Sequence, residues 1–373
     1  MKVAFDHQIF TFQRYGGASR YIVELANRLP AHGVSDVSVI APLHINNYLA
    51  ADSVRHLTRG RYVASTVGDS WIQIRQCLPL LDVINRAVAP VAWRGANADI
   101  VHQTYFSATK PVGKGQRRVV TVYDMTHDLF PEEFPFVKQT IAAKRAAVAR
   151  ADHIICISEN TRQDLVRLYG TDPARTSVVY LGHSLTAEPN AVQVRSGGNP
   201  TTLLYVGHRT GYKNFKTLLQ AYGSSPLLRE FELIAFGGFP PLPEEQEEMR
   251  RLGITDRVHF ESGSDSQLAA RYRAAAVFVY PSKYEGFGIP PLEAMSHGCP
   301  VVCSNAGSIP EVVGDAGVYF DPNSAEQLRT VLERVATSEG LQDALRVRGY
   351  ARINAFSWDR CAAESAKIYR ELI

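Results

Sequence analysis

Short, almost uninterrupted runs of Val, Ile and other apolar residues alternate with helical stretches along this chain. Strands that are apolar at nearly every position are typical of parallel sheets covered by helices on both faces. The alternation occurs in two successive series, so it predicts an α/β fold with two doubly wound parallel sheets. In the first series the predicted strands are 2–5, 36–40, 99–103, 118–123 and 153–158, and helices include 17–30 and 137–151. In the second series the predicted strands are 202–207, 231–237, 257–260, 276–282, 300–304 and 317–320.

A stretch rich in Gly, Pro, Asn and Ser separates the two series and is typical of a linker. We therefore expect a Rossmann-like domain over 1–183, a linker over 184–200 and a second Rossmann-like domain over 201–355. A final helix within 356–373 is expected to pack back on the first domain. Ligands of such sheets bind beyond the carboxyl ends of the strands, so the predicted site is a cleft between two facing domains.

Composition excludes several classes of protein. A net charge of +3 over 373 residues, without a basic stripe, argues against a nucleic-acid partner. The five cysteines fit no zinc or disulfide framework and are expected to be reduced. Because the N-terminus lacks an apolar signal region and no stretch of ~20 apolar residues occurs, we expect a cytosolic protein.

The stretch YEGFGIPPLEAM, residues 284–295, carries the densest group of candidate site residues. Gly286 and Gly288 allow the backbone to approach a ligand closely. Two prolines then suit the first turn of a helix, where no N–H partner is needed. The N–H groups of Phe287, Gly288 and Ile289 are therefore expected to face a phosphate near a helix N-terminus.

Two carboxylates flank this turn, because Glu285 precedes it and Glu293 lies near the start of the helix. Carboxylates accept hydrogen bonds in pairs from vicinal hydroxyls, so a nucleotide sugar would suit both. Arg209 and Lys213, in YVGHRTGYKNF (205–215), would supply positive charge for its diphosphate. Taken singly, each feature is more often an ordinary turn, a solvated helix residue or a surface charge. Together they fall on strand-to-helix loops of one series, which indicates a functional site.

These segments resemble the retaining GT-B glycosyltransferases of family 4. YEGFGIPPLEAMSHGCPVV resembles the paired-glutamate motif of that family, and YVGHRTGYKNF resembles its phosphate-binding Arg/Lys loop. IICISENTRQDL, YGGASRYIVELANRL and SIPEVVGDAG are also similar, so the likeness spans essentially the whole chain. The resemblance implies that Arg209 and Lys213 bind the donor diphosphate. It further implies that Glu285 and the turn amides bind sugar hydroxyls and phosphate, and that Glu293 binds the ribose.

The first series offers weaker candidates. Gly16 and Gly17 open the helix 17–30, and we expect Gly17 to approach the donor phosphate, with a plain turn as the alternative. TVYDMTHDLFPEEFP (121–135) places Asp124 and His127 after a buried strand, where catalytic groups are common. Asp124 is the first choice for contact with donor sugar or acceptor, and His127 the second.

Neighbouring histidines and one tyrosine qualify that expectation. Many members of the family have the pair His-Asp at the position where this chain has Tyr123-Asp124. This difference weakens the case that a histidine at that position contacts the sugar. His7 and His102, at strand ends, are further candidates to face the cleft.

No Asp-x-Asp pair occurs, and such a pair normally holds a divalent metal against a nucleotide diphosphate. We therefore expect no metal and no cofactor, with Arg209, Lys213, amides and a helix dipole neutralising the leaving group. The resemblance implies retention without a protein nucleophile, in which the leaving diphosphate accepts the proton of the acceptor.

Donor, acceptor and surroundings are expected from the resemblance alone. Bacterial surface-polysaccharide mannosyl- and rhamnosyltransferases look most similar, which favours a GDP-hexose over a UDP-hexose. The implied acceptor is a saccharide, with a polyprenyl-diphosphate carrier as an option. The apolar stretch 70–95 is interrupted by charges and is either an amphipathic core helix or a peripheral contact with the cytoplasmic face of a membrane. In the second case Trp71 and Trp93 would be its interfacial anchors.

Three other functions stay open at this point. A sugar-nucleotide epimerase or hydrolase would use the same architecture without an acceptor. A non-catalytic subunit could keep the fold, although the intact Arg209, Lys213, Glu285 and Glu293 argue against it. A dinucleotide oxidoreductase is disfavoured because no Gly-x-Gly-x-x-Gly follows a strand.

Overall fold

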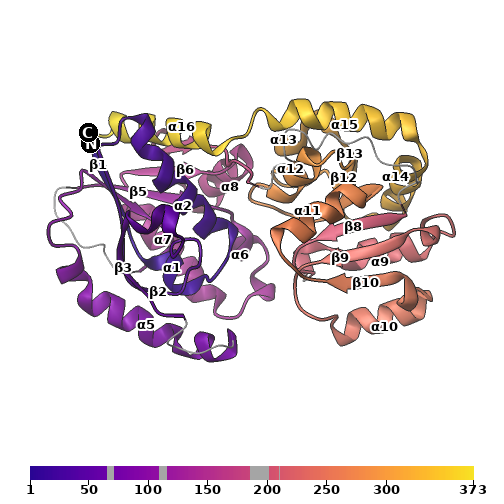
Figure 1. Ribbon diagram of the computed structural model, residues 1–373, viewed down its shortest axis with the longest axis horizontal. Helices are drawn as coiled ribbons and strands as arrows, with labels where there is room; N and C mark the ends of the chain where they lie inside the picture. Colours follow the sequence, from indigo (N-terminus) through magenta and orange to yellow (C-terminus); the bar gives the residue numbers. More distant parts are fainter. Residues whose placement is uncertain (65–70, 109–115, 185–200, 210) are drawn as a thin grey trace. The chain divides into compact units, whose positions relative to one another are not determined.

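The computed structural model describes residues 1–64, 71–108, 116–184, 201–209 and 211–373. The chain forms two compact units (Figure 1). The first comprises Met1–Leu181 and Trp358–Ile373, and the second comprises Gly182–Ser357. Most of the predicted linker, 185–200, lies outside the described residues.

The first unit is built on a seven-stranded sheet of order β3-β2-β1-β4-β5-β6-β7. Every pair of neighbouring strands is parallel. The strands are β1 (Lys2–Phe5), β2 (Asp36–His44), β3 (Thr58–Tyr62), β4 (Ile100–Gln103), β5 (Arg117–Val122), β6 (His153–Cys156) and β7 (Thr176–Val178). The α-helices are α1 (Gln8–Phe12), α2 (Gly17–Arg28), α3 (Asp52–Arg55), α5 (Trp71–Ala92), α6 (Thr126–Leu129), α7 (Val137–Arg150), α8 (Glu159–Tyr169) and α16 (Trp358–Glu371).

The second unit is built on a six-stranded parallel sheet of order β10-β9-β8-β11-β12-β13. The strands are β8 (Thr202–Val206), β9 (Glu232–Phe236), β10 (Val258–Glu261), β11 (Val277–Tyr280), β12 (Val301–Ser304) and β13 (Gly317–Phe320). The α-helices are α9 (Phe215–Gly223), α10 (Pro243–Leu252), α11 (Asp265–Ala274), α12 (Ile289–Ser296), α13 (Ile309–Val313), α14 (Ala325–Thr337) and α15 (Glu339–Ile353).

Strand order reverses in the middle of each sheet. In the second unit the chain moves outward from β8 through β9 and β10, then returns to pair β11 against the other side of β8. The loops after β8 and β11 therefore diverge at a topological switch point. Ligands of doubly wound sheets bind outside the carboxyl ends of the strands at such a point. This arrangement identifies the two loops in which to look for a site.

The predicted parallel strands are all present, because apolar side chains fill both faces of each sheet. The central strands β11 and β12 are buried along their whole length. Several helices begin at a serine whose hydroxyl accepts a backbone N–H, as at Ser158, Ser264 and Ser324. The core of each unit thus follows directly from the sequence pattern.

Two edge strands, β3 and β7, were not predicted from the sequence. β3 has the sequence TRGRY and exposes Arg59, Gly60 and Arg61, so it lacks the apolar run by which a strand is predicted. β7 is only three residues long. Both occupy the outer edges of the first sheet, where one side of a strand lacks a neighbour and polar residues are tolerated.

Helix α16 belongs to the first unit although it ends the chain, and it lies against α2 (Figure 1). Its Tyr369 hydroxyl is 2.5 Å from Nδ1 of His102 in β4. The other ring nitrogen of His102 is 2.8 Å from Oγ1 of Thr121 in β5. His102 has no exposed surface, so the expectation that it faces a cleft is wrong. It connects the sheet to the C-terminal helix inside the core.

Burial lowers the pKa of His102 to about 3, which predicts a loss of stability in mild acid. Below about pH 6.5 the unfolded chain binds a proton at this histidine while the folded chain does not. The stabilising contribution is therefore complete above pH ~6.5 and decreases on acidification, by at most about 1.4 kcal/mol per pH unit. His102→Gln should flatten the dependence of the unfolding free energy on pH between ~6.5 and ~5.

Urea titrations followed by tryptophan fluorescence would measure this slope in the first unit, to which Trp71, Trp93 and Trp358 all belong. His56→Gln is a matched control because His56 is exposed. A slope that is the same for His102→Gln and for the unchanged chain would contradict the prediction.

Candidate functional site

Lys213 and Glu285 meet at the switch point of the second sheet. Lys213 ends a short turn after β8, and Glu285 lies in the loop after β11. Nζ of Lys213 donates to both carboxylate oxygens of Glu285, at 2.8 and 2.9 Å. The side chains keep 20% and 10% of their surface exposed, so this pair is largely but not completely buried. A cation and a carboxylate are thus held together beyond the ends of adjacent strands.

Backbone ties fix the two loops to each other. The Asn214 side-chain amide donates to the Pro281 carbonyl at 2.9 Å and to the Pro322 carbonyl at 2.7 Å. The Lys283 N–H donates to the Tyr212 carbonyl at 2.7 Å. Asn214 is the N-cap residue of α9, but its side chain accepts no backbone N–H of that helix. These ties keep Lys213 opposite Glu285.

A third loop, after β12, supports the Glu285 loop through hydrogen bonds. The Ser308 hydroxyl is 2.9 Å from the Glu285 carbonyl oxygen and 2.8 Å from that of Phe287. At Gly307, with a φ of 58°, a Cβ would lie 3.0 Å from the Glu285 nitrogen. Only glycine therefore fits this close approach without strain. Sequence reasoning assigned no role to Gly307 or Ser308, although both are in or next to the quoted SIPEVVGDAG.

The turn before α12 leaves two backbone donors unused. Gly288 is the N-cap residue and has a φ of 114°, a conformation that favours glycine. Pro290 and Pro291 follow within the first turn and have no N–H. In the described part of the chain, the N–H groups of Gly288 and Ile289 donate to no protein acceptor. Unused amides at a helix N-terminus favour an anion.

Two buried tyrosines, Tyr280 and Tyr205, lie beside the Glu285 side chain. The Tyr280 hydroxyl donates to Glu285, and burial, followed by the charge of Glu285, raises the pKa of Tyr280 well above its usual value. Burial and Glu285 raise the pKa of Tyr205 in the same way. Because Tyr280 stays protonated, it donates to Glu285 together with Lys213 and fixes the orientation of the carboxylate.

Glu293 lies within α12 and is 7% exposed. The Tyr272 hydroxyl donates to one of its oxygens at 3.4 Å. Burial, and next the charge of Glu293, raises the pKa of Tyr272. A buried glutamate with a tyrosine partner differs from an ordinary solvated helix residue. The predicted contact of Glu293 with a ribose remains a prediction.

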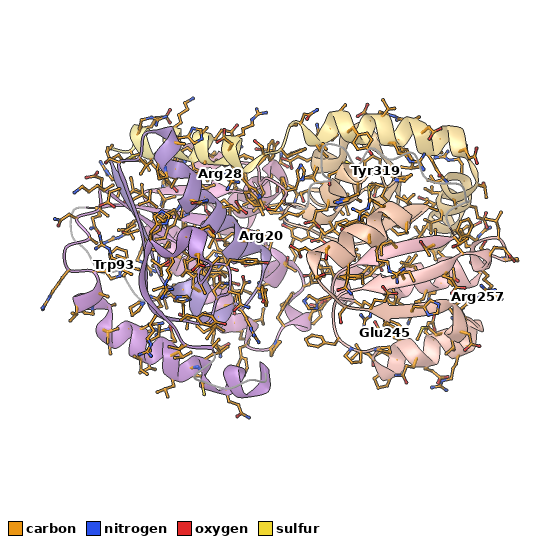
Figure 2. All side chains as sticks on the ribbon, viewed as in Figure 1. Arg20, Arg28, Trp93, Glu245, Arg257 and Tyr319 are labelled. Atoms are coloured by element: carbon orange, nitrogen blue, oxygen red, sulfur yellow. The ribbon has the colours of Figure 1, made fainter. Side chains whose placement is uncertain are left out.

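Arg209 has a fuller set of partners than the sequence suggested. Its Nε donates to Glu245 at 3.0 Å, and its terminal nitrogens donate to the Gly237 and Pro240 carbonyls at 3.1 and 3.2 Å. Figure 2 marks Glu245 on α10. The guanidinium also stacks 4.7 Å from the ring centre of Phe260. Arg209 thus joins the loops after β8 and β9, and a diphosphate would compete with these acceptors.

The candidates of the first unit lie after β5. Asp124 follows this strand, and one of its carboxylate oxygens accepts the Thr126 N–H at 2.9 Å. His127 lies in α6 with its ring 4.3 Å from that of Phe134. Burial lowers the pKa of His127, so the neutral imidazole is favoured. Both side chains are half-buried, which leaves part of each accessible.

Lys144, which sequence reasoning did not single out, holds this loop from α7. It has no exposed surface, and Nζ lies 2.8 Å from Asp128 and 3.1 Å from the Asp124 carbonyl. A lysine among alanines on a helix gives no sign in the sequence that it points inward.

Tyr123 and Gly17 are the two remaining positions of the first unit to which the sequence drew attention. Tyr123 is buried, and its hydroxyl donates to the Thr104 carbonyl at 2.8 Å. It therefore points into the first unit instead of offering a polar group beside Asp124. Gly17 opens α2 in the first unit, and an added Cβ there would meet nothing within 4 Å. Its approach to a donor phosphate stays a prediction.

Among the described residues, no group of three or more His, Cys, Asp and Glu side chains is arranged to hold a metal ion. The four cysteines at 156, 299, 303 and 361 are buried as free thiols, and Cys77 is half-buried.

Comparison with known proteins follows the division into units. A model of the family described as glycosyl transferases group 1 matches residues 188–352, and one described as glycosyltransferase family 4 matches residues 15–186. O-antigen chain mannosyltransferase B of Escherichia coli is 32% identical over 272 residues, 69% of this chain and 71% of that protein. The MMP alpha-(1->4)-mannosyltransferase of Mycolicibacterium hassiacum is 29% identical over 308 residues, 77% of this chain and 74% of that protein.

A solved structure agrees over the whole chain. Sucrose-phosphate synthase from Thermosynechococcus elongatus superposes with a TM-score of 0.73, covering 100% of this chain and 98% of its own, at 20% identity. This likeness shows the fold, so the predicted GT-B architecture of two parallel-sheet α/β domains is confirmed. The chain therefore belongs to glycosyltransferase family 4, and it is a glycosyltransferase.

Proposed function

We propose that this protein transfers a hexose, with retention of anomeric configuration, from a nucleotide sugar to a saccharide acceptor. The observation that carries the proposal is the Lys213–Glu285 pair at the switch point of the second sheet. A lysine there suits phosphate oxygens and a carboxylate suits sugar hydroxyls. The unused amides of Gly288 and Ile289 add donors for the anion beside them.

The roles follow from charge and position. Lys213 and the amides of the 286–289 turn would stabilise the charge that develops on the departing diphosphate. Glu285 would hold the transferred sugar, and Glu293 the ribose. Arg209 would bind the donor diphosphate. It would also hold in place the loop on which the diphosphate rests. The diphosphate itself would accept the proton of the attacking hydroxyl.

In the first unit, Asp124 is proposed to contact the donor sugar or the acceptor, with His127 as a second polar contact and Gly17 close to the donor phosphate. The neutral form of His127 suits a hydrogen-bonding role without added positive charge.

Mannose or a related deoxyhexose from a GDP-sugar is the donor that we propose, because two relatives are mannosyltransferases. A UDP-sugar donor is the alternative. Incubation with GDP-mannose, other GDP-hexoses and UDP-hexoses, each with and without a saccharide acceptor, would test both. We expect nucleoside diphosphate release that requires the acceptor, and a rise in melting temperature with GDP greater than with UDP. Acceptor-independent release would instead indicate a hydrolase, and interconversion of the sugar an epimerase.

Transfer is expected to need no divalent metal. The sequence has no Asp-x-Asp pair, and the Lys213 ammonium lies beside the proposed diphosphate position. Initial rates in excess EDTA should therefore equal those without it. Complete loss of activity that only Mg²⁺ restores would overturn this prediction.

An O-antigen chain mannosyltransferase among the relatives supports a role in surface-polysaccharide synthesis. We propose an acceptor carried on a lipid, with polyprenyl diphosphate as its linkage, and a cytoplasmic enzyme that works at the inner face of the membrane. None of the helices described by the structure is long and apolar enough to cross a bilayer.

A further inference from the structure

Helix α5 presents an apolar face to solvent. Of the side chains described in it, Leu80, Val83 and Val91 are 60%, 62% and 61% exposed, and Val88 is 37% exposed. The first three are spaced so that they share one face of a helix. Figure 1 shows α5 on the outside of the first unit, beside β2. A surface helix normally places polar residues on its outer face, so α5 departs from the usual arrangement.

Two polar residues of α5, Asp82 and Asn85, face inward. Asn85 accepts the Leu43 N–H at 2.9 Å and donates to Oγ1 of Thr11 at 2.9 Å. Asp82 is 8% exposed and forms an ion pair with Arg86 at 2.5 Å. These polar groups have partners within the unit. Their contacts therefore do not explain why the outer face of α5 is apolar.

The inner apolar contacts are complete as well. Trp93, marked in Figure 2, is 9% exposed and packs with Ala4, Ile40 and Val101. The expectation that Trp93 is an interfacial anchor is therefore wrong, because it belongs to the core. The side chain of Trp71 lies outside those that the structure describes. We call the exposed apolar side chains Leu80, Val83 and Val91 the stripe. Its exposure has to be explained by a partner outside the unit.

Charge around the stripe favours an anionic partner. Between 76 and 97, the exposed charged side chains are Arg86, which pairs with Asp82, and Arg94, and no carboxylate is exposed there. Long arginine side chains can lie along apolar surface while their guanidinium groups reach lipid phosphates. Apolar side chains flanked by basic ones are the pattern of helices that lie in a membrane interface.

The size of the stripe argues against a second copy of the chain as the partner. From Leu80 to Val91 the helix rises about 16 Å, and its width of ~10 Å gives a face of roughly 160 Å². A stable protein–protein interface needs about 800 Å² from each partner. A bilayer makes no such demand, because it accepts any apolar side chain that reaches its acyl region.

We infer that the outer face of α5 docks the protein on an anionic membrane surface, inserting Leu80, Val83 and Val91 and placing Arg94 among the phosphates. The inference rests on the proposed function only for its purpose, which is access to a lipid-linked acceptor. Its evidence is the exposed face of α5 itself.

Flotation of the full-length protein with phosphatidylcholine vesicles, with and without phosphatidylglycerol, would test it. We expect binding to the anionic vesicles, weakened by salt, and weaker binding to phosphatidylcholine alone. Leu80→Ser/Val83→Ser/Val91→Ser should reduce binding about tenfold or more, and Arg94→Gln should reduce only the part that depends on phosphatidylglycerol.

Val347→Ser is the matched control, because Val347 is 70% exposed on α15 of the second unit and should bind as the unchanged chain does. Failure of the unchanged chain to float, or equal flotation of the triple variant, would overturn the inference. The inference would also be overturned if the triple variant changed only the mass measured by light scattering. The outer face of α5 would then mediate self-association. None of these results depends on sugar transfer, so the proposed function stands or falls separately.

Discussion

Glu285→Gln should reduce kcat by about 10³-fold, equivalent to roughly 4 kcal/mol of transition-state stabilisation. Glutamine keeps the size of the side chain but has no charge, and it offers one acceptor oxygen where Glu285 offers two. Lys213 now donates to both oxygens of Glu285, at 2.8 and 2.9 Å. The substitution would therefore free the ammonium from its partner and remove the paired acceptor for sugar hydroxyls.

Lys213→Ala should lower kcat by at least about 10²-fold, because it removes the positive charge proposed to meet the diphosphate. Residues that act as a unit give strongly non-additive losses. The variant with both substitutions should therefore be little slower than the worse of the two single variants. Additive losses would show that the two side chains act separately.

Steady-state kinetics with a soluble acceptor would measure these effects, and urea titration would confirm that each variant is folded. Lys216→Ala is a suitable control, because Lys216 is an exposed lysine in the first turn of α9, three residues along the chain. Near wild-type rates for both Glu285→Gln and Lys213→Ala would place the site elsewhere.

The central strands of both sheets could be predicted because burial on two faces leaves a continuous apolar run in the sequence. The edge strand β3 could not, since its exposed residues Arg59 and Arg61 lie where one side of the strand faces solvent. Its strand conformation depends on pairing with β2, which is a tertiary effect.

The residues of the site also divide into those that the sequence could predict and those that it could not. Glu285 and Lys213 could be predicted together because each lies on a loop after a central strand, and strand ends of one sheet lie close together. The role of Ser308 could not be predicted, because it bonds to carbonyls that are 23 and 21 residues away in the chain. The partners of Arg209 were missed for the same reason, since its acceptors follow the next strand.

Lys144→Met should destabilise the first unit by about 3–5 kcal/mol, the usual cost of removing one partner from a buried ion pair. Lys144 has no exposed surface, and its ammonium contacts Asp128 at 2.8 Å and the Asp124 carbonyl at 3.1 Å. It also lies 5.4 Å from the ring centre of Phe106. Methionine would fill a similar volume but leave the Asp128 carboxylate, whose side chain is 6% exposed, without a cation.

Tryptophan fluorescence in urea would report this change, because all three tryptophans belong to the first unit. Lys138→Met, on the exposed side of the same helix, should change the unfolding free energy by less than about 0.5 kcal/mol. Lys144→Met/Asp128→Asn should recover part of the loss, because the Tyr169 hydroxyl can still donate to the amide oxygen that replaces a carboxylate oxygen. If Lys144→Met were as stable as Lys138→Met, the ion pair would not hold the loop that carries Asp124 and His127. The proposed positions of those two residues would then lack their structural support.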